Sequence, residues 1–293
     1  MTDPSVPAMP AETRRPPAAT ADPLPRIAFV GGGNMASALI GGLLDAGAEA
    51  GRVAVIENQL VAAQAIAERF HVEVSADTES ILNGAEVVVL AVKPQQLAAV
   101  CHANAATLAA KLVISIAAGI RTADLSRWLS GHARIVRAMP NTPAMVRAGV
   151  TGLYAMPAVA PEERAVAGRL LAAVGSIAWV DEEVALDAVT AISGSGPAYV
   201  FHFIEGLMAA GEQLGLSPAL ARQLALDTVS GAAQLARGSD DPPAVLRARV
   251  TSPGGTTQAA LAVFTQHDLI GIIAAAAQAA SQRAGELGDQ FGV

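Results

Sequence analysis

A loop late in the chain carries an unusual density of hydroxyl and glycine residues. Residues 251–257 read TSPGGTT and open an alanine-rich stretch of helical periodicity. Backbone N–H groups around Pro253, Gly254 and Gly255 would face an anion at the helix start, where the dipole favours negative charge. The Ser and Thr residues either cap this helix or bind a ligand. A cap needs one hydroxyl and the loop has four, which favours binding.

A second motif, near the start of the chain, is typical of dinucleotide binding. The run FVGGGNMASA has the spacing G-x-G-x-x-A between a strand-like and a helical run. Gly31 permits a tight turn, Gly33 lets a pyrophosphate approach, and Ala36 allows close packing of helix on strand. An ordinary glycine turn is the alternative, but the neighbouring elements favour the nucleotide site. The predicted cofactor residues here are Val30, Gly31, Gly32, Gly33, Asn34, Met35 and Ala36.

An acid stands at the end of the next strand-like run. Glu57 follows Gly33 by about 24 residues, near the roughly 20-residue offset of the acid that binds the adenosine ribose. A carboxylate there accepts from the 2′-hydroxyl of NADH and repels the 2′-phosphate of NADPH. A solvated surface acid is the alternative interpretation. The cofactor is therefore predicted as NADPH or NADH, with NADH used at least as well.

Three later strand-like runs, AVKP, SIAAG and MPNTP, end in small or polar residues. Ligands of open α/β sheets bind outside the carboxyl ends of the strands, so these ends are predicted to line the nicotinamide half of the groove. Lys93 either donates to ribose or phosphate, or belongs to a surface loop. The predicted cofactor residues of these ends are Ala91, Val92, Lys93, Pro94, Ala117, Ala118 and Asn141.

Apolar strand-like and helical runs alternate from Arg26 onward, which predicts βαβ units and a doubly wound parallel sheet of the Rossmann type. The strand signals stop near residue 180, and the remainder is helical. We predict an α/β domain over residues 26–182 and an all-α domain over residues 183–293. Residues 1–25 hold seven prolines and no apolar run, so we predict a disordered tail rather than a signal peptide.

Composition restricts the possible partners. The net charge is −7 and no block of Lys or Arg occurs, so nucleic acid and anionic membranes are not expected to bind. Cys101 is the only cysteine, which excludes an internal disulfide and fits the cytoplasm. The five histidines are scattered, so no metal site is expected. The apolar run LIGIIAAAAQAA is shorter than the roughly 20 residues of a membrane span.

The motifs, taken in order, resemble those of pyrroline-5-carboxylate reductases. They are FVGGGNMASALIGGL, AVKPQQL, SIAAG, RAMPNTPA, DAVTAISGSGPAYVF and LRARVTSPGGTTQAAL. The resemblance covers residues 26 to 282 and implies the NAD(P)H-dependent reduction of 1-pyrroline-5-carboxylate to L-proline, the last step of proline biosynthesis. It also implies a Rossmann domain and a helical dimerisation domain. The expected assembly is a homodimer, with rings of dimers up to a decamer as a further option.

The resemblance also implies roles for individual residues. Thr257 places its hydroxyl on the ring nitrogen of the substrate, and Ser252 is the second predicted catalytic residue. Predicted substrate-binding residues are Gly254, Gly255, Thr256, Thr257 and Ser195. For Ser195, in SGSGPAY, close helix packing is the competing interpretation, and for Asp240 surface solvation competes with a contact to the ring nitrogen.

At three positions the chain departs from the family pattern. Thr78, a further predicted cofactor residue, stands where the family often has Asn. Arg249 stands where some relatives have Asn, and Glu57 where NADPH users often have a non-acidic residue. These departures concern cofactor details and leave the reaction unchanged.

Two other classes of function are open to the sequence. A β-hydroxyacid dehydrogenase shares the glycine-rich start, but it needs a catalytic lysine in its helical domain, and no lysine follows Val184. A dinucleotide-sensing protein without turnover would not need the intact TSPGGTT loop.

Overall fold

The computed structural model describes residues 24–292. They belong to two compact units, one of residues 24–198 with 273–292 and one of residues 199–272. The predicted disordered tail lies outside the described residues up to residue 23. Leu24, which we placed in that tail, packs against the core of the first unit, and its carbonyl accepts from Arg52 at 3.1 Å.

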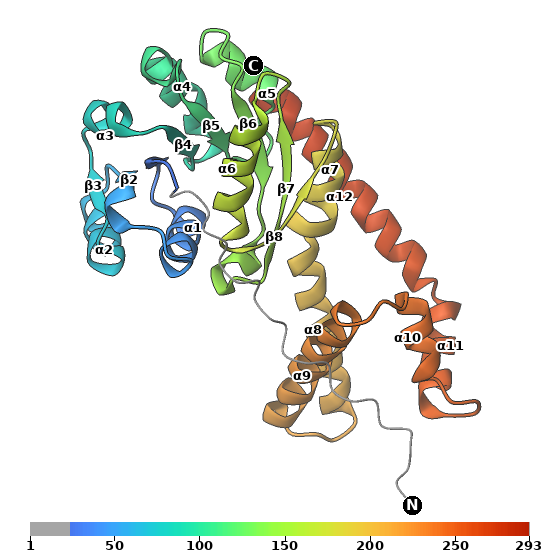
Figure 1. Ribbon diagram of the computed structural model, residues 1–293. Coiled ribbons are helices and arrows are strands. Elements are labelled where there is room, and N and C mark those ends of the chain that lie inside the picture. The colour runs from blue at the N-terminus through green and yellow to red at the C-terminus, as the bar shows by residue number, and fades with distance from the viewer. Residues whose placement is uncertain (1–23, 293) are drawn as a thin grey trace, which may run out of the picture. The chain divides into compact units, whose positions relative to one another are not determined.

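The first unit is built on one eight-stranded sheet (Figure 1). Its strands are β1 (Ile27–Val30), β2 (Val53–Ile56), β3 (Glu73–Ser75), β4 (Val87–Leu90), β5 (Leu112–Ser115), β6 (Ile135–Met139), β7 (Gly149–Ala155) and β8 (Gly175–Trp179). Their order is β3-β2-β1-β4-β5-β6-β7-β8, and only β6 and β7 pair antiparallel. The first six follow the order of the Rossmann fold, which confirms the predicted fold class.

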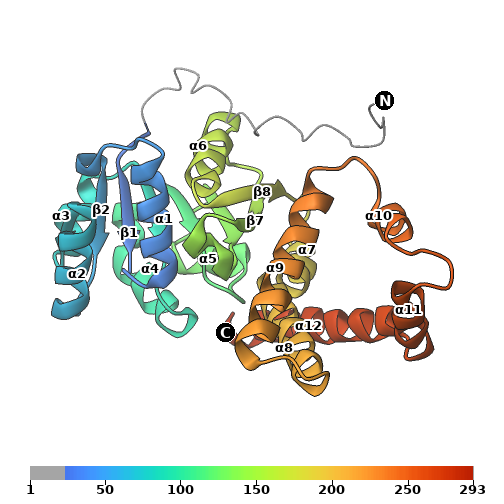
Figure 2. The same ribbon diagram turned by 90° about the horizontal axis from the view of Figure 1, so that it is seen from below.

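Helices cover both faces of this sheet (Figure 2). Their bounds are α1 (Asn34–Asp45), α2 (Leu60–Phe70), α3 (Thr78–Gly84), α4 (Pro94–Leu108), α5 (Thr122–Trp128) and α6 (Pro161–Ala172). Side chains of α1, α2 and α6 join one apolar core, and side chains of α3, α4 and α5 join the other. Strands β1, β4 and β5 are buried along their whole length, because each face of the sheet is covered.

Two strands were absent from the sequence-based prediction. β3 has only three residues, and β7 contains glycines at 149 and 152 that weaken its strand pattern. A side chain at Gly152 would lie 2.5 Å from Val189, so this glycine is needed for close packing rather than for a turn. Packing decided where these two strands form.

Helices make up the rest of the described chain. They are α7 (Ala185–Val189), α8 (Gly196–Gln213), α9 (Pro218–Arg237), α10 (Pro243–Arg249), α11 (Thr256–Gln266) and α12 (Leu269–Phe291). One π-helical turn, Thr190–Gly194, joins α7 to α8. Residues 199–272 form the second unit, in which Ala221 and Ala225 are buried while Phe201, Leu235 and Ile270 are 60%, 61% and 74% exposed.

The two compact units do not divide the chain at a single point. The part of α12 from residue 273 onward belongs to the first unit, as do residues 183–198. The domain boundary that the sequence predicts at residue 183 is not a boundary between these two units, and it stays a prediction.

Among the described helices no single one has the length and apolar character of a membrane span, although the bent pair α11 and α12 together would meet that criterion.

Candidate functional site

The glycine turn after β1 has the geometry of a phosphate site. Gly31 has φ +100°, and a side chain there would lie 2.9 Å from the carbonyl oxygen of Ala91. A Cβ on Gly33 would meet no protein atom within 4 Å, so space for a ligand is open beside it. Gly33 is the N-cap of α1 and offers no side-chain cap, which leaves the first-turn N–H groups for an anion.

Glu57 is held against this turn by two backbone amides. Gly32 N–H donates to one carboxylate oxygen at 3.0 Å, and Gln59 N–H donates to the other at 2.9 Å. The carboxylate is therefore fixed in place beside the turn. It retains lone pairs for a ribose hydroxyl, since each carboxylate oxygen accepts more than one hydrogen bond.

A cleft of about 640 Å³ begins at the turn and extends along α4. Nine of the predicted cofactor residues line it: Val30, Gly31, Gly32, Gly33, Glu57, Thr78, Ala91, Val92 and Lys93. Pro94, the tenth of this group, begins α4 next to Lys93 but is not a lining residue. Further lining residues that the sequence analysis missed are Ile56, Asn58, Gln59, Gln95, Gln96, Ala99, Val100 and Asn104. The first turns of α4 contribute most of these, and a helix start after a strand end was the signal that could have found them.

The other predicted cofactor residues lie outside this cleft. Ala36 is buried between α1 and the sheet, and Asn34 and Met35 belong to the first turn of α1. Ala117 and Ala118 lie in the loop after β5, where Ala117 is buried and Ala118 is exposed.

Asn141 is used within the fold. It is 8% exposed, its Oδ1 accepts from Val150 N–H at 2.9 Å, and its Nδ2 donates to the Ser193 carbonyl at 3.0 Å. The side chain thereby joins the end of β6 to the π-helical turn before α8. Its predicted contact with the cofactor stays a prediction, and its bonds in this structure are to the protein.

The loop of residues 252–257 corrects one detail of the sequence analysis. Its two glycine amides were expected to be bare. Gly254 N–H donates to Gln258 Oε1 at 2.6 Å, and Gly255 N–H donates to the Ser252 carbonyl at 3.0 Å. The loop closes on itself in this way because Gly254 adopts φ +71°, a conformation that favours glycine.

The next two residues of the loop remain available to a ligand. Gly255 is the N-cap of α11 and provides no side-chain cap. Within residues 24–292, the backbone N–H groups of Thr256 and Thr257 have no acceptor, and the hydroxyls of Ser252, Thr256 and Thr257 have no partner. Thr251 differs, because its hydroxyl donates to the Arg247 carbonyl at 2.6 Å. Only one of the four hydroxyls is therefore occupied by the protein, and none of them caps α11.

Ser195 and Asp240 are placed by different local structures. Ser195 N–H donates to the Thr190 carbonyl at 2.8 Å, which closes the π-helical turn just before α8. Such turns occur frequently at functional sites. Asp240 precedes Asp241, which pairs with Arg249 at 2.5 Å. Arg249, one of the departures from the family pattern, thus has an ion-pair partner within the second unit.

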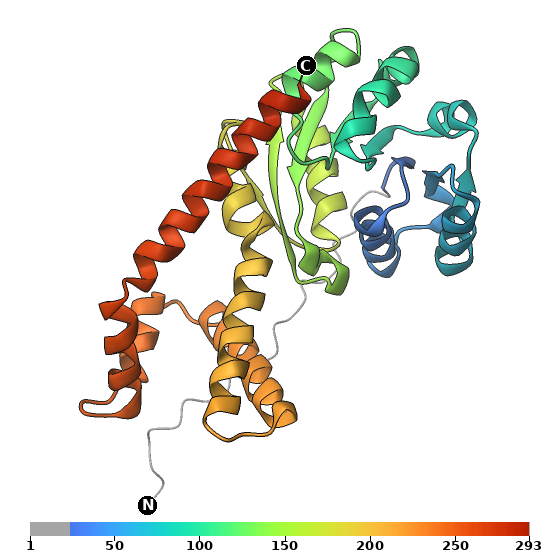
Figure 3. The same cartoon turned by 180° about the vertical axis from the view of Figure 1, so that it is seen from behind.

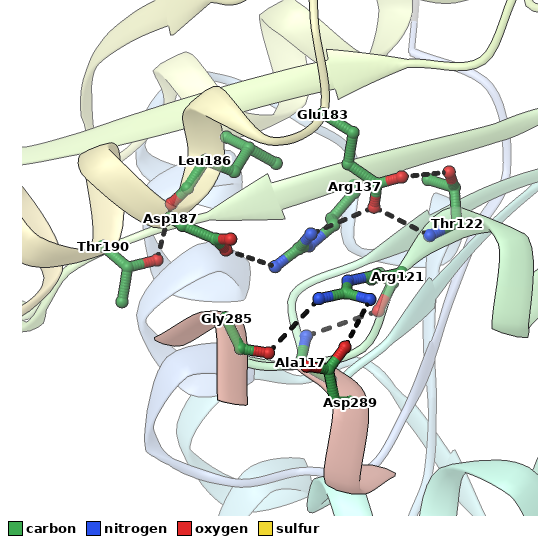
Figure 4. Close-up of polar contacts among 11 residues, drawn as sticks. Ala117, Arg121, Thr122, Arg137, Glu183, Leu186, Asp187, Thr190, Gly285 and Asp289 are labelled. Carbon is green, nitrogen blue, oxygen red and sulfur yellow. Dashed lines mark hydrogen bonds and ion pairs between the residues drawn. The ribbon is translucent and has the colours of Figure 1, made fainter. Parts of the chain in front are cut away.

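A polar network joins the sheet to the two helices that flank it (Figure 4). The buried Arg137 of β6 contacts Glu183 at 3.0 Å and Asp187 at 3.8 Å. Glu183 also accepts from the amide and hydroxyl of Thr122, at 2.8 and 2.6 Å. Because a buried guanidinium needs charged partners, this network fixes the start of α7 on the sheet. Nearby, Arg121 forms an ion pair with Asp289 and donates to the Gly285 carbonyl, both in α12.

A parallel sheet with a glycine turn, an acid after β2 and an open cleft at that edge defines a dinucleotide-binding protein of the Rossmann class. Two family models match the chain. One, described as pyrroline-5-carboxylate reductase dimerisation, matches residues 183–287, and the other, described as NADP oxidoreductase coenzyme F420-dependent, matches residues 26–119.

Individual relatives agree with the first model. The pyrroline-5-carboxylate reductase of Pseudomonas aeruginosa is 47% identical over 92% of this chain and 98% of its own. A solved pyrroline-5-carboxylate reductase from Coxiella burnetii has a TM-score of 0.87 at 42% identity, covering 90% and 98% of the two chains. The Plasmodium falciparum enzyme, solved with NADP bound, has a TM-score of 0.80 at 29% identity, covering 90% and 98%.

The chain belongs to the pyrroline-5-carboxylate reductase family. It is accordingly an NAD(P)H-dependent oxidoreductase of proline biosynthesis, and its helical region is a dimerisation domain. The resemblance stated from the motifs is confirmed. The alternative of a β-hydroxyacid dehydrogenase is excluded by these relatives.

Proposed function

We propose that this reductase binds the carboxylate of 1-pyrroline-5-carboxylate at the loop of residues 252–257 and reduces its C=N bond with NADH. Hydride is transferred from the nicotinamide to the imine carbon, and L-proline is the product. The single observation that carries the assignment of the loop is the set of unpartnered groups at the start of α11: the N–H groups of Thr256 and Thr257 and three hydroxyls.

The chemistry of the substrate suits such a loop. A pyrrolinium nitrogen is largely protonated near neutral pH, so the ring arrives already activated for hydride attack. Residues 252–257 contain no titratable side chain, which fits a reaction that needs no dedicated acid or base. The loop's task is then to bind the anionic end and to align the ring, and alignment contributes several kcal/mol to catalysis.

Within the loop, each group has a proposed role. The first-turn amides of α11, at the positive end of the helix dipole, bind the substrate carboxylate. The hydroxyl of Thr257 accepts a hydrogen bond from the ring N–H, and the hydroxyls of Ser252 and Thr256 complete the polar contacts. The amides of Gly254 and Gly255 form internal bonds, so we assign those two residues to loop shape rather than to direct binding.

We also propose that Glu57 makes NADH at least as good a cofactor as NADPH. Its carboxylate is fixed by two amides beside the glycine turn, and Lys93 is the only cationic residue among those that line the cleft. A 2′-phosphate would meet the carboxylate with little compensation. A 2′-hydroxyl would instead donate to it.

The assembly and the location follow as further proposals. The helical unit exposes large apolar side chains, as expected for a surface that is buried against a second copy, so we propose a homodimer. Assembly of dimers into a decamer is a further option. A cytoplasmic location without nucleic-acid or membrane partners fits the acidic charge and the single buried cysteine.

The test is an assay of the purified chain with 1-pyrroline-5-carboxylate and either NADH or NADPH, followed by loss of absorbance of the reduced nicotinamide. We expect turnover with both cofactors and kcat/KM for NADH equal to or above that for NADPH. A large preference for NADPH would remove Glu57 from the ribose site. Absence of turnover with both would refute the proposed reaction.

A further inference from the structure

The last turns of α12 lie directly on the loop between β5 and α5, residues 116–121 (Figure 3, Figure 4). Gly119 of this loop has φ +73°, and a side chain there would come within 3.2 Å of Leu287 and Phe291. A side chain at Gly288 of α12 would come within 2.9 Å of the Arg121 guanidinium. Both surfaces therefore depend on glycine, because the loop and the helix approach too closely for a Cβ.

Arg121 joins these two surfaces by directed bonds. One guanidinium nitrogen contacts Asp289 Oδ1 at 2.8 Å, and the other donates to the Gly285 carbonyl at 3.2 Å. The two acceptors lie one helical turn apart, so the planar guanidinium spans the turn, which a lysine could not do. The position near the C-terminal end of α12 also places a cation at the negative end of the helix dipole.

The other side of the loop is fixed as well. Thr122, the residue after Arg121, is bonded through its amide and hydroxyl to Glu183. At the strand end, Ala117 N–H donates to Ser115 Oγ at 3.4 Å. Ala117 and Ala118 thus lie between a strand end and an anchored segment, and their position depends on where the anchor holds residues 119–121.

We propose that Arg121 is a positioning residue for hydride transfer: by fixing α12 on the loop of residues 116–121, it sets the position of Ala117 and Ala118 against the nicotinamide half of the cofactor. The inference rests on the proposed function and on the prediction from the sequence that these two alanines line that half of the groove. Residues 116–121 do not line the cleft at the glycine turn, so binding of the adenosine half is independent of the anchor.

The ion pair itself contributes little to stability. The side chains of Arg121 and Asp289 are 41% and 73% exposed, and solvent screens pairs that are exposed to this degree. Loss of the anchor should therefore affect geometry at the loop more than the folding of the chain. A positioning residue is therefore expected to change turnover without changing the stability of the fold, whereas a merely structural residue would change both.

The experiment compares binding and turnover in Arg121→Ala, Arg121→Lys and Gly288→Ala, with Glu286→Gln as the matched control. Glu286 is on the same helix but pairs with Arg283 rather than with the loop. For Arg121→Ala and Gly288→Ala we expect kcat to fall and KM for NADH to rise, together lowering kcat/KM by about tenfold or more, because small misplacements are costly in hydride alignment. The Kd of ADP-ribose, which lacks the nicotinamide, should stay unchanged, as should the thermal midpoint.

Arg121→Lys keeps the charge without the two-pronged contact and should recover only part of kcat/KM, while Glu286→Gln should behave as the unsubstituted chain. Gly288→Ala carries the same test if Arg121→Ala does not fold. Unchanged kinetics in both variants would overturn the proposal, and so would a parallel loss of ADP-ribose and NADH affinity. If the unsubstituted chain does not turn over pyrroline-5-carboxylate, the proposed function fails, but the ratio of NADH to ADP-ribose affinity still tests the anchor.

Discussion

The two compact units of this chain are stabilised in different ways. In the unit built on the sheet, two apolar cores contain side chains such as Phe29, Leu39 and Leu97 that are fully buried. In the unit of residues 199–272, Ala221 and Ala225 are the described residues that are buried, and large side chains such as Phe201 and Ile270 are mostly exposed. One unit completes its core within a single chain, whereas the other leaves its apolar surface in contact with water.

The difference agrees with the match of residues 183–287 to a family model for dimerisation. Contiguous exposed apolar surface on a soluble protein marks an interaction site, because burying it removes unfavourable contact with water. The helices of the second unit satisfy most of their backbone hydrogen bonds within each helix. Their side chains lack a core, and a second copy of the chain can provide one.

The largest effect on assembly and activity is expected from a charge on the exposed apolar surface of the helical unit. Ile270→Asp places a charge on the exposed apolar surface of the helical unit, and we expect loss of the dimer and of nearly all activity. Val61→Asp is the matched control, since Val61 is 82% exposed on α2 of the other unit. Sedimentation velocity with far-UV circular dichroism measures both. Retention of the same oligomer in Ile270→Asp would show that this surface is not an interface.

The next effect concerns the helical unit's chemistry. Thr257→Ala removes the hydroxyl proposed to bind the ring nitrogen, and kcat/KM should fall by about 10²-fold, as when a positioned polar group is lost. The matched control is Thr251→Ala, because the Thr251 hydroxyl is already bonded to the Arg247 carbonyl. Steady-state kinetics with pyrroline-5-carboxylate decide the matter. Equal kinetics in Thr257→Ala and the unsubstituted chain would exclude the assigned role.

A smaller change is expected in the sheet unit's nucleotide cleft. Glu57→Ser removes the carboxylate that we propose repels a 2′-phosphate, and like charges side by side cost several kcal/mol. The ratio of kcat/KM for NADPH over NADH should rise by at least about tenfold. Glu49→Ser, at an exposed acid of the same unit outside the cleft, serves as the control. If the ratio were the same in both variants, Glu57 would be a solvated acid only.

The smallest effect is on stability, also in the sheet unit. His132 is 8% exposed and its Nε2 has no partner among the described residues, and burial lowers the pKa of its imidazole. The folded state therefore favours the neutral imidazole. The stability that this preference provides is complete above the unfolded pKa of about 6.5, and it is lost as the pH falls through the lower pKa of the folded state. Each unit of pKa difference is worth about 1.4 kcal/mol.

The measurement is urea unfolding at a series of pH values from about 7.5 to about 5, because this range spans the pKa of about 6.5 of a free imidazole. The unsubstituted chain should lose stability toward the acid end more steeply than His132→Leu. His202→Leu is the control, because the His202 side chain is 89% exposed. Parallel pH dependence in His132→Leu and the unsubstituted chain would contradict the assignment.

Much of the sheet unit could be predicted because its signals are local. The continuous β-branched runs around Val88 and Ile114 predicted strands buried on both faces, and the glycine turn at Gly31 predicted the nucleotide cleft. The loop of residues 252–257 was equally visible, as a cluster of hydroxyls before a helix. None of its hydroxyls caps α11, so the capping interpretation is wrong, and ligand binding by the loop stays a prediction.

Other features could not be predicted, because they depend on the conformation of individual side chains and turns, which motif spacing does not determine. Asn141 follows a strand end, as a ligand-binding residue would, but its side-chain amide is hydrogen-bonded to the Val150 N–H and the Ser193 carbonyl. The glycine amides of the substrate loop were expected to be bare, and the side chain of Gln258 occupies one of them.

By itself, the sequence determined the Rossmann class, the two motif-bearing regions and the family, since backbone propensity, periodicity and motif spacing are properties of neighbouring residues. Only the tertiary structure decided that strand β7 joins the sheet antiparallel, that Glu57 is fixed by two amides, and that Arg121 meets α12 across more than half of the chain. Such contacts arise from packing, in which the position of each side chain depends on every neighbour around it. That dependence is not encoded in any one stretch of residues.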